Sequence, residues 1–330
     1  MDERAWNVVT GGAGFVGSHL VDALIERGAR VLILDNLSTG RLANVEDALA
    51  TGFARFVEAD VACDAGSLRA AIDGAGARGV GRIWHLASPA SPEAYGANPW
   101  ETLAVNAVGT MSLVELALER GARFIFSSTS EIYGDPLVHP QPESYFGNVD
   151  PIGPRACYDE GKRFAEAAIS VAVRARGLDA KVVRFFNCYG PRMESGDGRL
   201  IPALVDAALA GRRLPIQGTG RQTRSMTYID DAIDLLLTVA DSPVGDLRPV
   251  NVGNDDERSV EDIARVFASV ADVPYDPEYL PPREGDPQRR RPELTRARAL
   301  GWAPSTPLER GLRLTYEWFA AQRVPASGRG

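Results

Sequence analysis

Six short apolar runs alternate with helical segments through the first 186 residues of this 330-residue chain. The apolar runs cover residues 6–10, 30–34, 54–58, 82–86, 122–127 and 181–186. Helix-like spacing of apolar residues marks segments 15–27, 67–73, 102–120 and 155–176. Strands that are apolar along nearly their whole length, with helices between them, are typical of a parallel sheet buried on both faces. The pattern therefore predicts an α/β fold with a Rossmann-type, doubly wound parallel sheet.

The pattern is less regular after residue 188, where prolines and glycines separate shorter elements. Short strands are expected near Leu214 and Met226, and an Arg- and Pro-rich loop over 273–292. A strand is expected over 250–252, and helices over 200–210, 230–240, 260–270 and 308–321. A chain of this length favours one large unit with a smaller lobe. We therefore expect a first domain over 1–188, to which 226–252 returns, and a discontinuous C-terminal lobe over 189–330.

The charge and the cysteines narrow the possible functions. The formal net charge of −8 argues against general binding to nucleic acid or to an anionic membrane surface. We expect no membrane span, because no apolar stretch approaches the ~20 residues that a span needs. The three cysteines are scattered and have no histidine nearby, which predicts no metal site and fits a reducing cytoplasm.

A glycine-rich turn follows the first predicted strand and opens the first predicted helix. Gly12-x-Gly14-x-x-Gly17, extended by Gly11, allows a tight turn, and the helix N-terminus can offer N–H groups to a pyrophosphate. Asp35 ends the second strand, where a carboxylate can accept from the ribose hydroxyls and repels a 2′-phosphate. These residues predict NAD rather than NADP.

Asp60 and Val61 follow the third predicted strand and are placed to meet the adenine. A strand-end aspartate that caps the next turn is an almost equally good interpretation of Asp60.

Tyr158 and Lys162 are four residues apart on a predicted helix, so their side chains leave the same face. An ammonium beside a phenol favours the phenolate, which predicts a lowered pKa for Tyr158 and a base for an alcohol proton. Only two of the 36 basic residues are lysines, so chance pairing is improbable. Thr129 lies just past the fifth predicted strand, where its hydroxyl could reach the reacting alcohol. Ser130 and Glu131 follow it, although a polar loop with a capping glutamate is an equal alternative.

Longer strings around these residues resemble the extended short-chain dehydrogenase/reductase superfamily, and within it the UDP-glucuronate decarboxylase family. The strings cover residues 11–17, 35–41, 85–91, 129–134, 153–163, 186–193, 197–199 and 286–292, and the similarity runs essentially end to end. The Tyr-Asp-Glu-Gly-Lys-Arg and His-Leu-Ala-Ser-Pro-Ala-Ser strings are the ones most specific to the decarboxylases. The resemblance implies NAD as the cofactor. It places Phe15, Val16, Asn36, Ser38, Thr39, Gly40, Leu86, Ser88, Tyr158 and Lys162 beside the cofactor.

The resemblance also implies a reaction and the residues that perform it. NAD takes a hydride from sugar C4, the resulting 4-ketone loses CO₂ from C5, and the hydride returns, so UDP-glucuronate becomes UDP-xylose. Tyr158 is then the base, Lys162 adjusts its pKa, and Thr129 completes the triad. Ser130, Glu131 and Arg290 serve the carboxylate and proton-transfer steps. The residues that hold the nucleotide sugar, in the C-terminal lobe and around it, are Asn187, Arg199, Arg224 and Arg290.

Two other functions remain open from the residues alone. A nucleotide-sugar 4-epimerase or 4,6-dehydratase shares most of these strings, but the triplet at 129–131 lacks the Asp-Glu pair typical of dehydratases. A non-catalytic NAD(H)-binding protein commonly loses the Tyr–Lys pair, which is intact here. We further expect a cytoplasmic homodimer that pairs through helices 102–120 and 155–176, unless their apolar faces only cover the sheet.

Overall fold

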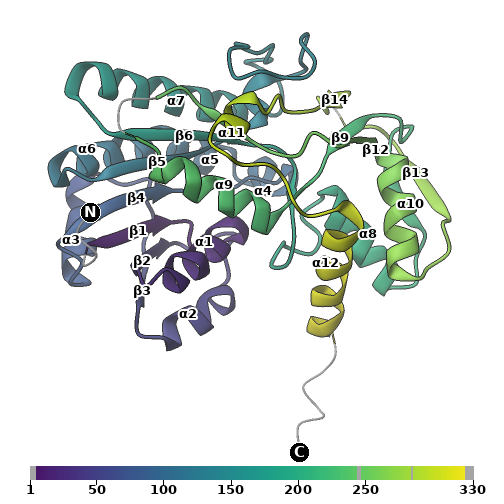
Figure 1. Cartoon of the computed structure of the whole chain (residues 1–330), viewed down its shortest axis with the longest axis horizontal. Coiled ribbons are helices and arrows are strands. Elements are labelled where there is room, and N and C mark those ends of the chain that lie inside the picture. Colours follow the sequence, from purple (N-terminus) through teal and green to yellow (C-terminus); the bar gives the residue numbers. More distant parts are fainter. Residues whose placement is uncertain (1–4, 244–246, 284, 324–330) are drawn as a thin grey trace, which may run out of the picture.

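The computed structural model describes residues 5–243, 247–283 and 285–323, and its centre is a parallel sheet (Figure 1). The strands are β1 (Trp6–Thr10), β2 (Arg30–Asp35), β3 (Ala54–Glu58), β4 (Val80–His85), β5 (Arg123–Thr129), β6 (Ala180–Phe185) and β11 (Val250–Val252). They form a seven-stranded sheet in the order β11-β6-β5-β4-β1-β2-β3. The predicted strands are found within about two residues of their expected bounds, and the Rossmann-type fold is confirmed.

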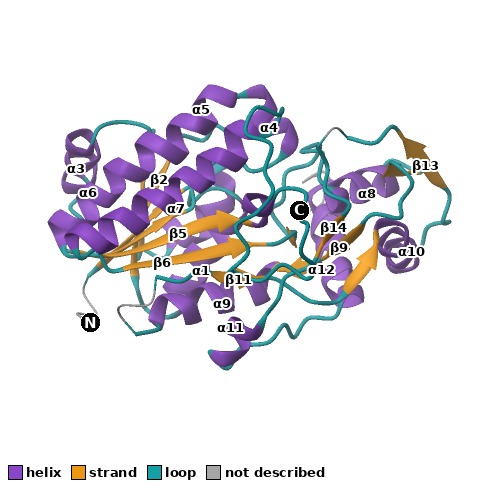
Figure 2. Ribbon diagram, turned by 90° about the horizontal axis from the view of Figure 1, so that it is seen from above, coloured by secondary structure: helices purple, strands orange, loops and turns teal. Residues whose placement is uncertain are grey.

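Helices cover both faces of the sheet, as Figures 1 and 2 show. One layer holds α3 (Ala65–Gly74), α6 (Thr110–Arg120) and α7 (Ala156–Arg176). The other layer holds α1 (Phe15–Glu26), α2 (Glu46–Ala50) and α9 (Ile229–Asp241). Successive strand residues face opposite layers, so Val8 packs in the first layer's core and Val9 in the second's. Burial on both sides explains why the strands are nearly all apolar.

A continuous helix over residues 99–120 includes a π-helical turn. It consists of α5 (Pro99–Ala104), the turn η2 (Val105–Gly109) and α6, and it starts at Pro99 rather than at residue 102. By length and composition it could cross a membrane, with a mean hydropathy of 1.2, contrary to the expectation from sequence. It packs against α3, α7 and β4, and 56% of its apolar 18-residue stretch is buried inside the protein. This packing is that of a helix in the protein core.

The C-terminal lobe combines helices with two small sheets beside the carboxyl ends of the main strands (Figure 2). Its helices are α8 (Leu200–Leu209), α10 (Val260–Ala271) and α12 (Leu308–Arg323). One sheet pairs β8 (Leu214–Gln217) with β13 (Pro277–Leu280), and the other joins β12 (Glu257–Ser259), β9 (Thr223–Ser225) and β14 (Arg289–Arg290). The prediction of an irregular loop over 273–292 is therefore wrong in part. β13 and β14 are too short for a periodic pattern, and they form because an edge strand is there to pair with.

Short connecting elements complete the chain. They are η1 (Leu42–Val45), α4 (Pro92–Ala97), η3 (Ser130–Tyr133), β7 (Cys188–Tyr189), β10 (Thr227–Tyr228) and α11 (Thr295–Ala299). After β10 the chain forms α9, which packs on α1, and then β11, which pairs with β6 in the main sheet. Strand β5 and turn η3 follow one another directly, so the residues from 127 to 131 lie at the carboxyl edge of the sheet.

Candidate active site

Two cavities meet at Tyr158, at the carboxyl edge of the main sheet. The first has a volume of about 810 Å³ and the second about 290 Å³. Both are lined by Tyr158 and Ser127, and also by Phe15, Val16, Ala90 and Arg199. The carboxyl edge of a parallel sheet is where ligands bind in such folds. A group in one cavity can therefore react with a group in the other beside Tyr158.

Every residue predicted for the cofactor lines the first cavity. The residues of this set are Gly11, Gly14, Phe15, Val16, Gly17, Asp35, Asn36, Ser38, Thr39, Gly40, Asp60, Val61, Leu86, Ser88, Tyr158 and Lys162. Most of these residues lie at or just after the carboxyl ends of different strands, and Tyr158 and Lys162 lie on α7. The fold thus brings residues that are scattered in the sequence to one cavity. Arg192 and Glu194, which the sequence patterns did not predict, also line this cavity.

The glycine turn fits a dinucleotide pyrophosphate. A Cβ on Gly17 would lie 2.0 Å from the carbonyl oxygen of Gly11, and Gly11 itself has a φ of 70°. The N-cap residue of α1, Gly14, makes no side-chain capping bond, so the first N–H groups of the helix are left for a ligand. Free N–H groups at a helix N-terminus are suited to phosphate.

We expect Gly17→Ala to unfold at a temperature at least several degrees lower and to lose the bound cofactor. The added methyl cannot fit beside the Gly11 carbonyl, and overpacking of this kind costs about 1–3 kcal/mol or more. Gly74→Ala is the matched control, because a Cβ there meets no atom within 4 Å. Thermal unfolding and the NAD content of both variants test this. Equal behaviour of the two variants would contradict it.

Asp35 and Asp60 both carry hydrogen bonds to the backbone. Asp35 is 7% exposed and accepts from the N–H of Ala13 at 2.9 Å and of Leu37 at 2.8 Å, while burial raises its pKa. Asp60 accepts from the N–H of Ala62 at 2.8 Å. The capping role that was the alternative for Asp60 is thus present together with its place on the cavity wall.

Tyr158 and Lys162 lie together as their spacing predicts, but their pKa values move the other way. Burial raises the pKa of Tyr158 well above its ordinary value, and a hydrogen bond with Thr129 opposes this only in part. Lys162 donates to the carbonyl oxygen of Ser127 at 2.7 Å, and its Nζ lies 5.9 Å from the centre of the Tyr158 ring. Burial lowers the pKa of Lys162 to about 7. The predicted lowering for Tyr158 is therefore wrong for the chain by itself, because loss of water disfavours both charged forms.

We expect Lys162→Met to stabilise the cofactor-free protein by about 2 kcal/mol near pH 7. Lys162 has an ordinary pKa of 10.5 and a pKa of about 7 in the fold. Between these values the unfolded chain binds more protons, so stability rises with pH as the cost of the buried ammonium is relieved. The gain of the variant should therefore be full below pH 7 and should vanish towards pH 10. Urea unfolding at pH 6, 8 and 10 tests this, and a loss of stability at pH 6 would contradict it.

The triplet 129–131 lines the second cavity. Thr129 is the last residue of β5, not a residue beyond it, and its hydroxyl oxygen accepts from the N–H of Glu131 at 3.1 Å. Burial would raise the pKa of Glu131, but Arg290, Arg155 and Arg224 together lower it below its ordinary value. Glu131 is therefore an ionised carboxylate held by arginines, and the residue that caps the turn η3 is Thr129, not Glu131.

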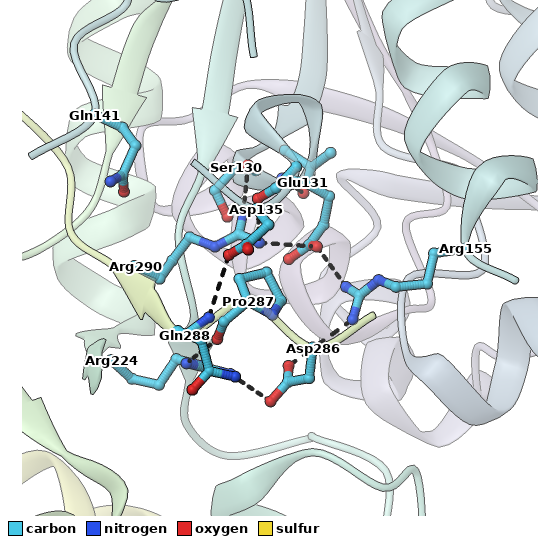
Figure 3. Close-up of polar contacts among 12 residues, drawn as sticks. Ser130, Glu131, Asp135, Gln141, Arg155, Arg224, Asp286, Pro287, Gln288 and Arg290 are labelled. Atoms are coloured by element: carbon cyan, nitrogen blue, oxygen red, sulfur yellow. Dashed lines mark hydrogen bonds and ion pairs between the residues drawn. The ribbon is translucent and has the colours of Figure 1, made fainter. Parts of the chain in front are cut away.

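Three arginines and two carboxylates form a cluster in the second cavity, which Figure 3 shows. Arg290 and Arg155 both donate to Oε2 of Glu131, and Arg224 donates to Oδ2 of Asp286 at 2.7 Å. The Nη1 atom of Arg155 lies 3.9 Å from Oδ1 of Asp286. These five side chains, three guanidinium groups and two carboxylates, carry one positive charge in excess. Burial raises the pKa of the neighbouring Asp159 to about 7, so this carboxyl offsets the excess only in part.

Sequence reasoning found part of this cavity. All four predicted substrate residues line it, and so does the triplet 129–131. The four are Asn187, Arg199, Arg224 and Arg290. The Nδ2 atom of Asn187 is buried and has no partner among the described residues. Arg155, Asp286 and Tyr95 were missed, although all three line the cavity. A signal existed for Arg155, three residues before Tyr158, and for Asp286, the first residue of the string 286–292.

Comparisons with known proteins agree with this geometry. The model of the NAD dependent epimerase/dehydratase family matches residues 7–253. UDP-glucuronic acid decarboxylase 1 of Danio rerio is 42% identical over 97% of this chain and 74% of its own length. UDP-glucuronic acid decarboxylase 2 of Arabidopsis thaliana is 43% identical over 96% of this chain and 68% of its own.

Solved structures resemble the whole chain as well. UDP-glucose 4-epimerase of Thermotoga maritima with UDP-glucose has a TM-score of 0.86 and 31% identity, over 96% of this chain and 99% of the epimerase. A dTDP-glucose 4,6-dehydratase of Streptomyces venezuelae, solved with NAD, has a TM-score of 0.85 and 28% identity, over 96% and 98%. The epimerase and the dehydratase thus share the fold, while the decarboxylases share more of the sequence.

Proposed function

The chain belongs to the NAD dependent epimerase/dehydratase family, and we propose that it converts UDP-glucuronate to UDP-xylose and CO₂ through a 4-keto intermediate. The excess positive charge of the second cavity carries this proposal. A buried guanidinium without a counter-charge is costly, and a carboxylate on the substrate would balance it with charge-assisted hydrogen bonds. A sugar acid meets this need, and UDP-glucuronic acid decarboxylases at 40–43% identity are named for such a substrate.

NAD is the cofactor of this family, and when bound it supplies the hydride acceptor at sugar C4 and gives the hydride back at the end. The wall of the first cavity holds it. To accept the proton of the C4 hydroxyl, Tyr158 has to be a phenolate, and the positive charge that oxidised NAD would bring to the first cavity favours that form. The Thr129 hydroxyl, which bonds Tyr158, helps to orient the C4 oxygen. Lys162 fixes the same region through its bond to Ser127. Since Tyr158 lies between the two cavities, it can serve a sugar held in the second one.

The second cavity then serves the loss of CO₂. Arg290 engages the sugar carboxylate, which becomes a β-keto acid once C4 is a ketone. The C5–CO₂ bond breaks, its electron pair moves into the C4 ketone to give an enolate, and a proton returns to C5. Ser130 and Glu131, beside Arg290, serve these carboxylate and proton-transfer steps. The nucleotide part of the substrate is held by Asn187, Arg199 and Arg224 in the same cavity.

An epimerase is the second candidate, because the Thermotoga maritima enzyme shares the fold at 31% identity. The diphosphate of such a substrate could meet Arg199 and Arg224, but its neutral hexose would bring no carboxylate to the buried Arg290, which disfavours it.

Incubation of the purified protein with UDP-glucuronate, followed by NMR and by CO₂ release, tests the proposal. We expect CO₂ and UDP-xylose, or CO₂ with the 4-keto-pentose if the reduced cofactor escapes. Formation of UDP-galacturonate without CO₂ would favour the epimerase and contradict the decarboxylase.

We also propose that the protein is a homodimer that pairs through the outer faces of the helix over 99–120 and of α7. Exposed apolar side chains stand there: Val108 is 49% exposed, Met111 53%, Phe164 46% and Val171 56%. The inner faces of the same helices cover the sheet. Light scattering should give a dimer for the native chain and a monomer for Met111→Glu with Val171→Glu. A native monomer would contradict the proposal.

We propose a cytoplasmic location, since the three cysteines are free thiols at intermediate exposure. Detection of the protein with a secreted or membrane fraction would contradict this.

A further inference from the structure

Arg155 connects the base to the carboxylate-binding cluster. It precedes the first residue of α7, and its carbonyl oxygen accepts from the N–H groups of Tyr158 and Asp159, both at 3.0 Å. Its guanidinium lies 5.9 Å from the centre of the Tyr95 ring, which stacks on the Tyr158 ring at 5.3 Å. The Arg155 side chain is 16% exposed. Arg155 therefore contacts the second cavity and, through Tyr95, is linked to the ring of Tyr158.

Glu131 is shared between two arginines. Nη2 of Arg155 and Nη2 of Arg290, the latter at 3.1 Å, both donate to the same oxygen, Oε2 (Figure 3). The two arginines come from opposite sides of that oxygen, one from the start of α7 and one from β14. A substrate carboxylate on Arg290 would compete with Glu131 for its N–H groups and would repel Glu131. Arg155 is then the cation left to hold Glu131.

We propose that Arg155 is a positioning residue that keeps Glu131 in place and balances its charge while Arg290 binds the substrate carboxylate. The inference rests on the proposed function, because only a sugar acid makes Glu131 give up Arg290. Asp286 assists by standing 3.9 Å from the other terminal nitrogen of Arg155. It follows that Arg155 acts on the affinity for a sugar acid without binding that acid itself.

Binding to the NAD-loaded full chain measures this directly. Titration calorimetry in a Tyr158→Phe background avoids turnover, and the ligands are UDP-glucuronate and UDP-glucose. We expect Arg155→Met to weaken UDP-glucuronate about 10- to 100-fold, since Glu131 then competes for Arg290 alone. The affinity for UDP-glucose should change less than about two-fold. Arg155→Lys, which keeps a cation near Glu131, should recover part of the loss.

A double-mutant cycle separates positioning from direct binding. Glu131→Gln removes the competing charge, so we expect it to tighten UDP-glucuronate binding. In that background Arg155→Met should add less than about three-fold to the dissociation constant. Arg163→Met is the matched control: Arg163 is on the same helix and bonds the carbonyl oxygen of Ile132, but not Glu131. It should leave the ratio of the two affinities unchanged.

Three results would overturn the inference. The first is an equal loss of affinity for UDP-glucuronate and UDP-glucose in Arg155→Met. The second is a loss of UDP-glucuronate affinity in Arg155→Met that stays just as large when Glu131→Gln is also present. The third is weaker UDP-glucuronate binding by Glu131→Gln alone. The last uses no change at Arg155, so misfolding of the Arg155 variants cannot leave the question open. Failure of the proposed function shows elsewhere, as an absence of CO₂ from the native enzyme.

Discussion

Replacing Tyr158 with phenylalanine should abolish CO₂ release from UDP-glucuronate, with a loss in kcat of about 10³-fold or more, while NAD stays bound. The phenol is 6% exposed and lies where the two cavities meet, so no water can easily replace it as the base. Phenylalanine keeps the ring that stacks on Tyr95, and the fold should therefore survive. The experiment compares the rate of CO₂ release, the NAD content and the unfolding temperature of the variant and the native chain.

A matched change elsewhere makes the result specific. Tyr279→Phe removes the same hydroxyl from a side chain that is 52% exposed, and its rate should stay within about two-fold of the native rate. If Tyr158→Phe kept a tenth of the native rate, another group would be the base. The ionised Glu131 would then be the first candidate, because it lines the second cavity together with Tyr158.

The fold could be predicted where burial imposes a simple pattern on the sequence. Residues 8–10 and 31–34 are buried in a parallel sheet that is covered on both faces, and all of them except Thr10 are apolar. The strands β13 and β14 carry no such pattern, since Pro277 and Arg290 pair only because β8 and β9 offer an edge. Tertiary placement, and not local propensity, forms these strands.

The candidate site divides in the same way. Tyr158 and Lys162 are linked by one helical turn, and the glycines by one tight turn, so spacing alone reveals them. Arg155 and Asp286 are 131 positions apart in the sequence and meet only when the C-terminal lobe closes on the sheet. Protonation was predicted wrongly for a related reason. Spacing shows that an ammonium is near a phenol, but not that both are buried.

Arg290 is the least exposed of the three arginines of the cluster. It is 2% exposed and donates to the carbonyl oxygen of Ser130 as well as to Glu131. On one side its strand pairs with β9. On the other, the next residue, Arg291, exchanges two hydrogen bonds of 2.9 Å with the buried Gln141. These contacts on both sides fix the backbone at Arg290, whose guanidinium lines the second cavity.

We therefore expect Arg290→Met to lower kcat/KM for UDP-glucuronate by about 10⁴-fold, because both the carboxylate fork and a buried charge are lost. Arg290→Lys should recover little, since an ammonium cannot make two parallel bonds to a carboxylate. Arg289→Met is the matched control, because the neighbouring Arg289 has a 58% exposed side chain near Glu257 and should tolerate the change. The Glu131→Gln background also distinguishes the role of Arg290 from that of Arg155. In that background, Arg290→Met should still weaken UDP-glucuronate binding, whereas Arg155→Met should have little effect. The same effect from both changes would contradict a direct role for Arg290 alone.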